Sequence, residues 1–442
     1  MKISFIGAGS IGFTQTLVRD LLKVPEFQDI TFSFHDISEK NLDLVSRLIQ
    51  KDIEQNKLPA KIEQSTDRKK SLDGAKYIIN CTRIGGLEAF EHDINIPLQY
   101  GVDQCVGDTI CAGGILYGQR NIPQTLNFCE DIKSYSHKDA LFLNYSNPMA
   151  MNTWAAVSEA KVNTVGLCHG VQGGAKLISK ALGSENDTDL EYMCSGINHM
   201  TWYIELKYKG KNVTKDELVE ALENHPEISK QEKVRIDILK RFGLFSTESN
   251  GHLSEYLPWY RKRVEEIPKW IDLSNWIHGE TGGYLRVTSE KRNWFVEDFS
   301  KFLNESGIDL STHKRSTEHG SYIIEAIETN RSYRGHFNVV NNGTITNLPD
   351  DCVIESTGMV DKDGIKMIKG IELPMACASL CRTSIDVQRM AVKAAIEGDI
   401  NLLKLAVLQD PLVSAVCSPD EVWAMVDEML VAQSKWLSLI HI

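Results

Sequence analysis

The chain has no apolar run of the ~18 residues that a membrane-spanning helix needs, so a protein crossing a membrane on helices is excluded. It also lacks repeats, low-complexity tracts and a CxxC pair among its ten cysteines, which are typical of buried cytoplasmic thiols. Basic residues are in the minority, with 48 Lys and Arg against 60 Asp and Glu. The net charge of −12 argues against a nucleic-acid partner.

The first part of the chain alternates apolar strands with amphipathic helices. This alternation predicts a parallel sheet buried on both faces by helices, which is an α/β fold. The opening MKISFIGAGS reads as the first strand and not as a signal peptide, because it has no long apolar core and no cleavage site. The strands are expected at residues 2–9, 30–37, 76–86, 140–148 and 164–170.

After about residue 195 the pattern changes. A strand arm turning at Gly210 and a pair of antiparallel strands around Asn342-Gly343 are expected, followed by about 60 helical residues. These features indicate an α+β half that packs against the first. We therefore predict a dinucleotide-binding domain over 1–195 and a second domain over 196–442.

A complete GxGxxG motif lies between the first strand and the first helix, with glycines at Gly7, Gly9 and Gly12 and with Ser10 inside the motif. In this position it predicts a dinucleotide site, because the glycines admit a pyrophosphate to the free N–H groups of the helix. Asp36 ends the second strand, where an acidic residue favours NAD over NADP. The alternatives are a glycine turn that binds nothing and an aspartate that caps a helix.

Polar side chains follow the other strands, where open α/β sheets bind ligands. They are Arg83, Asn147, the pair Cys168-His169, and His199. Cys168 and His199 have no short-range metal spacing, so their positions alone favour a buried thiol and a core histidine. With substrate oxygens, the same two side chains would suit a divalent transition metal.

Two further segments allow two interpretations each. The glycine-rich stretch 107–114 carries Asp108 and is either a loop over the nicotinamide or a tight turn. The segment 247–260 combines polar and aromatic residues, including Tyr256. It is either a sugar-binding face or an aromatic-rich loop that packs on the core.

Taken in order, the motifs along the whole chain resemble those of the family-4 glycoside hydrolases, the NAD- and metal-dependent glycosidases. The α-galactosidases are the most similar subgroup. The motifs are FIGAGS at the start, RIGG at 83–86, DT-x-x-x-GGI at 108–115, LNYSNPMAMNTWA at 143–155, GLCHG at 166–170, GINHM at 196–200 and VNNGTITNLP at 340–349.

The resemblance implies a Rossmann domain related to lactate and malate dehydrogenases, with an α+β partner domain, in a homodimer or homotetramer. It implies that Cys168 and His199 bind Mn²⁺. The substrate would be a small α-glycoside, and the location cytoplasmic. The residues expected to bind NAD are Gly7, Gly9, Ser10, Gly12, Asp36 and Arg83.

The mechanism that the resemblance implies is an exception among glycosidases. NAD oxidises carbon 3 of the sugar, the metal polarises the ketone, a base removes the carbon-2 proton, and the glycosidic oxygen leaves. Water then adds and the hydride returns, so the cycle is redox-neutral. Tyr256 matches the base, with Tyr260 as the fallback, and Asp108 matches the acid. Asn147 would bind sugar hydroxyls, and His169 occupies the specificity position.

Two departures from the family pattern bear on the substrate. Phe90 stands where members acting on 6-phosphorylated sugars carry an arginine, which disfavours a phosphorylated substrate. Gly170 stands where the α-galactosidases carry serine, so α-glucosidase and α-glycuronidase remain alternatives. From another class, a hydroxy-acid dehydrogenase could use Arg83 and His169 but would leave Cys168 without a role.

Overall fold

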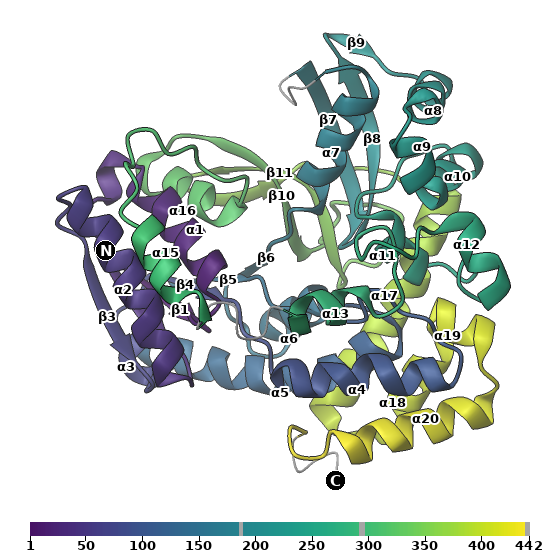
Figure 1. Ribbon diagram of the computed structural model, residues 1–442, viewed down its shortest axis with the longest axis horizontal. Helices are drawn as coiled ribbons and strands as arrows, with labels where there is room; N and C mark the ends of the chain where they lie inside the picture. Colours follow the sequence, from purple (N-terminus) through teal and green to yellow (C-terminus); the bar gives the residue numbers. More distant parts are fainter. Residues whose placement is uncertain (185–188, 291–296, 438–442) are drawn as a thin grey trace.

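The computed structural model describes residues 1–184, 189–290 and 297–437, and is built around one mixed sheet (Figure 1). Its first part is parallel, with the order β3-β2-β1-β4-β5-β6 that defines a Rossmann dinucleotide-binding sheet. The predicted α/β class is thereby confirmed. The strands are β1 (Lys2–Ile6), β2 (Thr31–His35), β3 (Lys61–Ser65), β4 (Tyr77–Asn80), β5 (Leu141–Asn144) and β6 (Thr164–Gly166).

Strand β3 was not predicted from the sequence. Four of its five residues KIEQS are polar and three are exposed, because β3 is the edge strand and, in the described part of the chain, pairs with β2 alone. A charged edge of this kind protects a sheet from pairing with other chains, but it removes the apolar pattern by which a strand is recognised.

Helices cover both faces of the parallel part, as the alternating pattern predicts. One face packs against α1 (Ile11–Leu22), α2 (Glu39–Gln55) and α16 (His319–Thr329), with α15 (Phe299–Glu305) beside α2. The other face packs against α3 (Arg68–Leu72), α5 (Cys111–Tyr135) and α6 (Met149–Ser158). The inner strands β1, β2, β4, β5 and β6 are therefore largely buried on both sides, which leaves their carboxyl ends as the place for a ligand.

The second part of the chain extends the same sheet. β10 pairs antiparallel with β6 through Asn338 and Gly166, and the order continues β11-β7-β8-β9. The predicted turn at Gly210 joins β8 to β9, and β10 and β11 are antiparallel as expected. The predicted domain boundary at 195/196 falls inside β7 and stays a prediction. The strands are β7 (Leu190–Ile197), β8 (Met200–Tyr208), β9 (Lys211–Asn212), β10 (Tyr333–Val340), β11 (Val353–Asp361) and β12 (Gly364–Met367).

The C-terminal helices pack on the first half of α5 and form the largest core with it (Figure 1, green to yellow). They are α17 (Met375–Glu397), α18 (Ile400–Gln409), α19 (Pro411–Val416) and α20 (Pro419–Ala432). No helix among the described residues has both the length and the apolarity to cross a membrane. The remaining helices are η1 (Pro25–Phe27), α4 (Gly86–Gln99), α7 (Gly170–Ala181), α8 (Lys215–Asn224), α9 (Ile228–Gln231), α10 (Lys233–Phe242), α11 (Asn250–Glu255), η3 (Val264–Glu266), α12 (Ile267–Trp270) and α13 (Gly283–Glu290).

Candidate active site

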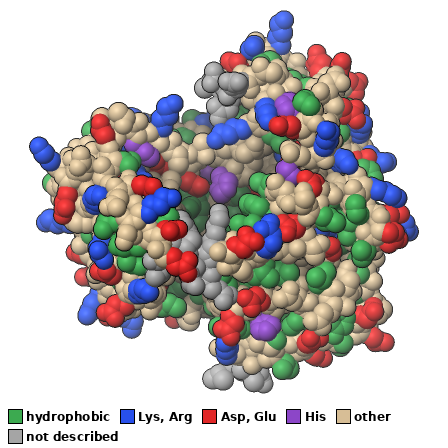
Figure 2. All heavy atoms as spheres, viewed as in Figure 1, with side chains coloured by type: hydrophobic (Ala, Val, Ile, Leu, Met, Phe, Trp, Pro, Cys, Tyr) green, Lys and Arg blue, Asp and Glu red, His purple; other side chains and the backbone are tan. Residues whose placement is uncertain are grey.

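The carboxyl ends of the parallel strands open into one cavity of 1320 Å³. The face seen in Figure 1 is hollowed near its middle, where a histidine side chain reaches the surface (Figure 2). Of the predicted site residues, Gly9, Gly12 and Tyr256 do not line the cavity. Those that line it are Gly7, Ser10, Asp36, Arg83, Asp108, Asn147, Cys168, His169 and His199.

The glycine-rich turn leaves the N-terminus of α1 open. Gly7 has φ +84°, a left-handed conformation that favours glycine, and the Ser10 side chain does not cap α1. The Gly9 N–H donates to Asp36 Oδ2 at 2.8 Å, and the Ser38 N–H donates to Asp36 Oδ1 at 2.8 Å. Each carboxylate oxygen keeps a second lone pair for a ribose hydroxyl. Asp36 can thus bind a ribose, and the uncapped N-terminus of α1 can bind a dinucleotide phosphate.

The three glycines of the motif have different surroundings. A Cβ on Gly9 would lie 2.6 Å from Asp36 Oδ2, and one on Gly7 would lie 2.9 Å from the Thr82 side chain. A Cβ on Gly12 would meet no atom within 4 Å. The first two glycines are thus required by the protein's own packing, whereas Gly12 borders open space.

Cys168 follows β6, His199 lies between β7 and β8, and folding brings both to Glu248. The sulfur, imidazole nitrogen and carboxylate oxygen all lie within 4.8 Å of one another. His199 and Glu248 both have positive φ, +63° and +77°, which non-glycine residues rarely adopt and which clusters at functional sites. A thiolate, an imidazole and a carboxylate form a donor set that suits a divalent transition metal.

Burial shapes the protonation of the first two donors. It lowers the pKa of His199 to about 4, so the imidazole is neutral at pH 7 and its lone pair is available. Burial, with the charges of Glu355 and Glu248, raises the pKa of Cys168 well above its ordinary value. A cation would therefore have to displace a proton from this thiol.

Asp108 lines the same cavity and accepts hydrogen bonds from three side chains. Its Oδ2 accepts from Arg83 Nη2 at 2.8 Å, and its Oδ1 accepts from Asn147 Nδ2 at 3.0 Å and Thr109 Oγ1 at 2.9 Å. The Arg83 guanidinium in turn lies 4.6 Å over the Phe90 ring. Arg83, which we predicted to contact the cofactor, is thus engaged with the predicted acid.

Tyr256 is buried outside the cavity lining. Its ring packs edge-on against His252 at 5.5 Å, and its Oη has no hydrogen-bond partner in the described part of the chain. Burial raises its pKa, and the negative charges of Glu248 and Glu255 add to that shift. The fallback, Tyr260, donates its hydroxyl to Asp237 at 2.7 Å. Both rings belong to the core, so this segment does not present them as an exposed sugar face.

His169 lies at the rim of the cavity. Its side chain is 69% exposed, and its Nδ1 is 3.3 Å from Glu318 Oε1. The hydrogen bond with Glu318 raises the pKa of His169. Sequence reasoning did not single out Glu318, which immediately precedes α16.

Comparison with known proteins identifies the family of the chain. The pattern described as family 4 glycosyl hydrolase matches residues 2–184, and that of the family 4 glycosyl hydrolase C-terminal domain matches 194–413. The chain therefore belongs to glycosyl hydrolase family 4, and the resemblance inferred from the motifs is confirmed. Family membership favours the glycosidase prediction over the hydroxy-acid dehydrogenase.

Two relatives are α-galactosidases. The chain is 63% identical to that of Rhizobium meliloti, over 99% of this chain and 89% of the relative. It is 35% identical to that of Bacillus subtilis, over 99% of both chains.

Two solved structures illustrate the fold. One is a 6-phospho-α-glucosidase from gut microorganisms in complex with NAD and Mn²⁺, with a TM-score of 0.81, 18% identity, and coverage of 99% of this chain and 98% of that one. The other is malate dehydrogenase from Naegleria fowleri, with a TM-score of 0.52, 10% identity, and coverage of 89% and 98%. The predicted likeness to the malate dehydrogenase fold is confirmed.

Proposed function

We propose that the protein is an α-galactosidase that hydrolyses unphosphorylated α-galactosides by a redox-neutral oxidation, elimination, addition and reduction, with NAD and Mn²⁺ bound in the cavity. The carrying observation is that Cys168, His199 and Glu248 converge in the same cavity as the open end of α1. The 63% identity to an α-galactosidase supports the substrate class. A homodimer or homotetramer in the cytoplasm is part of the proposal.

When bound, NAD supplies a reversible hydride acceptor and Mn²⁺ supplies Lewis acidity. The Gly7–Gly12 turn and Asp36 would hold the dinucleotide, and Cys168 and His199 would hold the metal. This division leaves proton transfer to the protein's own side chains.

Asp108 is the proposed acid for the leaving oxygen, with Arg83 and Asn147 holding its two oxygens in place. Asn147 also lines the cavity, where it can reach sugar hydroxyls. Tyr256 is the preferred base over Tyr260, because its hydroxyl is not engaged with another described residue. Since Tyr256 does not line the cavity, this role requires its side chain to turn into the cavity when substrate binds. Burial raises the pKa of Tyr256, and the positive charge of a cation beside Cys168 would lower it again.

A neutral sugar fits the charges of the cavity. Each arginine among its described lining residues has a carboxylate partner: Arg68 pairs with Asp131, Arg83 with Asp108, and Arg235 with Glu232. No lysine lines the cavity in the described part of the chain. A phosphate or a uronate carboxylate would therefore lack an unpaired cation, which favours a galactoside over a galacturonide or a 6-phosphoglycoside.

The test is a panel of nitrophenyl α-galactoside, α-glucoside, α-glucuronide and 6-phosphoglucoside, each assayed with NAD and Mn²⁺. We expect the highest kcat/KM with the α-galactoside and no turnover after NAD is removed. Preference for the α-glucoside would overturn the assigned sugar, and full activity without NAD would overturn the mechanism.

A further inference from the structure

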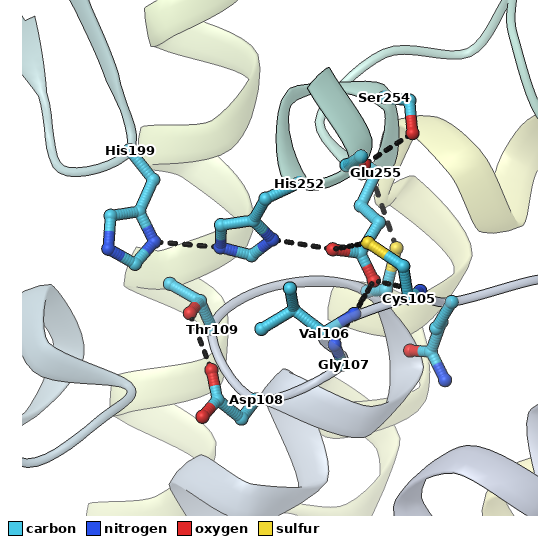
Figure 3. Close-up of polar contacts among 12 residues, drawn as sticks. Cys105, Val106, Gly107, Asp108, Thr109, His199, His252, Ser254 and Glu255 are labelled. Carbon is cyan, nitrogen blue, oxygen red and sulfur yellow. Dashed lines mark hydrogen bonds and ion pairs between the residues drawn. The ribbon is translucent and has the colours of Figure 1, made fainter. Parts of the chain in front are cut away.

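A chain of hydrogen bonds extends from the metal-site histidine into the protein (Figure 3). His199 Nδ1 lies 2.7 Å from His252 Nε2, and His252 Nδ1 lies 2.5 Å from Glu255 Oε2. His252 and Glu255 are both buried, on the short helix α11. The i, i+3 spacing places them on one face of that helix.

The other carboxylate oxygen of Glu255, Oε1, binds the backbone of the loop that precedes Asp108. Glu255 Oε1 accepts from the backbone N–H groups of Cys105, Val106 and Gly107 at 2.9, 3.0 and 3.0 Å. These residues lead directly into Asp108, the proposed acid. One buried carboxylate thus joins the metal-site histidine to the loop that carries the acid (Figure 3).

The direction of each hydrogen bond follows from donor and acceptor chemistry. A carboxylate only accepts, so Glu255 Oε2 accepts a hydrogen bond from His252 Nδ1–H, and in the neutral His252 ring Nε2 is then the acceptor. His199 Nδ1 must therefore donate to His252. The lone pair of His199 is left on Nε2, the nitrogen that lies 3.6 Å from Glu248 Oε2 in the metal cluster.

We propose that His252 and Glu255 are positioning residues that fix His199 in the tautomer able to bind the metal through Nε2, while Glu255 anchors the loop of Asp108. The inference rests on the proposed function of the Cys168–His199 site and deepens it. Groups of this kind orient metal-binding histidines in other proteins, and their loss costs about 10- to 100-fold in metal affinity.

Glu255→Gln separates the two roles. The three backbone N–H groups hold the amide oxygen of the glutamine, so its NH₂ must face His252 Nδ1. His252 Nδ1 then accepts and its Nε2 carries the proton, which obliges His199 Nδ1 to accept and moves the His199 proton to Nε2. The loop stays anchored while the metal-binding lone pair is lost.

The experiment measures Mn²⁺ affinity from the electron paramagnetic resonance signal of free Mn²⁺, and NAD affinity in parallel, on the full-length protein. For Glu255→Gln we expect Mn²⁺ affinity to fall about 10- to 100-fold with NAD affinity unchanged. The matched control is Asp52→Asn. Asp52 is also buried, pairs with Arg19 and holds the N–H groups of Gly307 and Ile308, but it does not line the cavity.

His252→Phe supplies a second variant and closes a double-mutant cycle. Phenylalanine keeps the ring packing but gives His199 no acceptor, so Mn²⁺ affinity should fall. In the His252→Phe background, Glu255→Gln should change the Mn²⁺ affinity by less than about 3-fold, because the hydrogen bonds from His199 through residue 252 to residue 255 are already lost. Unchanged affinity in both single variants, or fully additive losses, would overturn the inference. Absence of Mn²⁺ binding in the wild type would instead overturn the proposed function.

Discussion

The carboxylate of Glu248 occupies the space that a side chain on residue 170 would need. A Cβ added to Gly170 would lie 2.6 Å from Glu248 Oε2 and 3.6 Å from the sulfur of Cys168. Gly170, which stands where the α-galactosidase pattern has serine, is therefore in contact distance of Glu248, the third donor of the proposed metal site. A substitution of Gly170 should therefore change the affinity for the metal more than the specificity for the sugar.

Gly170→Ala should lower Mn²⁺ affinity about tenfold, a loss like that of other groups that orient metal ligands, while the fold survives, because the end of a flexible glutamate can move aside. Gly173→Ala is the matched control on the same helix, since a Cβ there meets nothing within 4 Å. Calorimetric titration with Mn²⁺ measures both. Equal affinities for the two variants would remove Glu248 from the donor set.

Binding of Mn²⁺ should release about one proton per site near pH 7. Burial raises the pKa of Cys168, so the thiol is protonated until a cation binds its sulfur. The proton count comes from calorimetry in buffers of different ionisation enthalpy. Cys168→Ser should lose most of the affinity and the proton release. Buffer-independent enthalpies with the wild type would contradict a thiolate ligand.

Asp108→Asn should slow α-galactosides with poor leaving groups far more than nitrophenyl galactosides. General acid catalysis contributes about 100- to 10,000-fold, and an activated leaving group needs little of it. The ratio of kcat/KM for melibiose to that for the nitrophenyl substrate should therefore fall. Equal losses on both substrates would assign Asp108 to orientation through Arg83 and Asn147.

Hydrolysis in heavy water should give sugar deuterated at carbon 2, because a base exchanges the abstracted proton with solvent. Tyr256→Phe should abolish this exchange while Mn²⁺ and NAD still bind, since the phenylalanine ring retains the contact with His252. Mass spectrometry of the product measures the label. Tyr260→Phe is the comparison, and loss of exchange in that variant alone would transfer the base role to Tyr260.

Residues at the ends of apolar strands could be predicted from the sequence. Asp36 and Cys168 each follow such a strand, and the structure brings both to one cavity. Glu248 could not be found in this way, because it follows no parallel strand and meets Cys168 only through tertiary folding. The i, i+3 spacing of His252 and Glu255 is compatible with a pair on one helix face, but the aromatic residues around them are equally typical of a sugar-binding face.

The pairing of β10 with β6 has a mechanical consequence for turnover. Many two-domain enzymes open and close by bending at a hinge. Here such bending would pull apart Asn338 and Gly166, two residues before Cys168. We therefore expect the continuous sheet to keep the distance between the nucleotide turn and the proposed metal site fixed when ligands bind. We expect sugar to enter and leave at the rim of the cavity, where the exposed His169 lies 3.3 Å from Glu318.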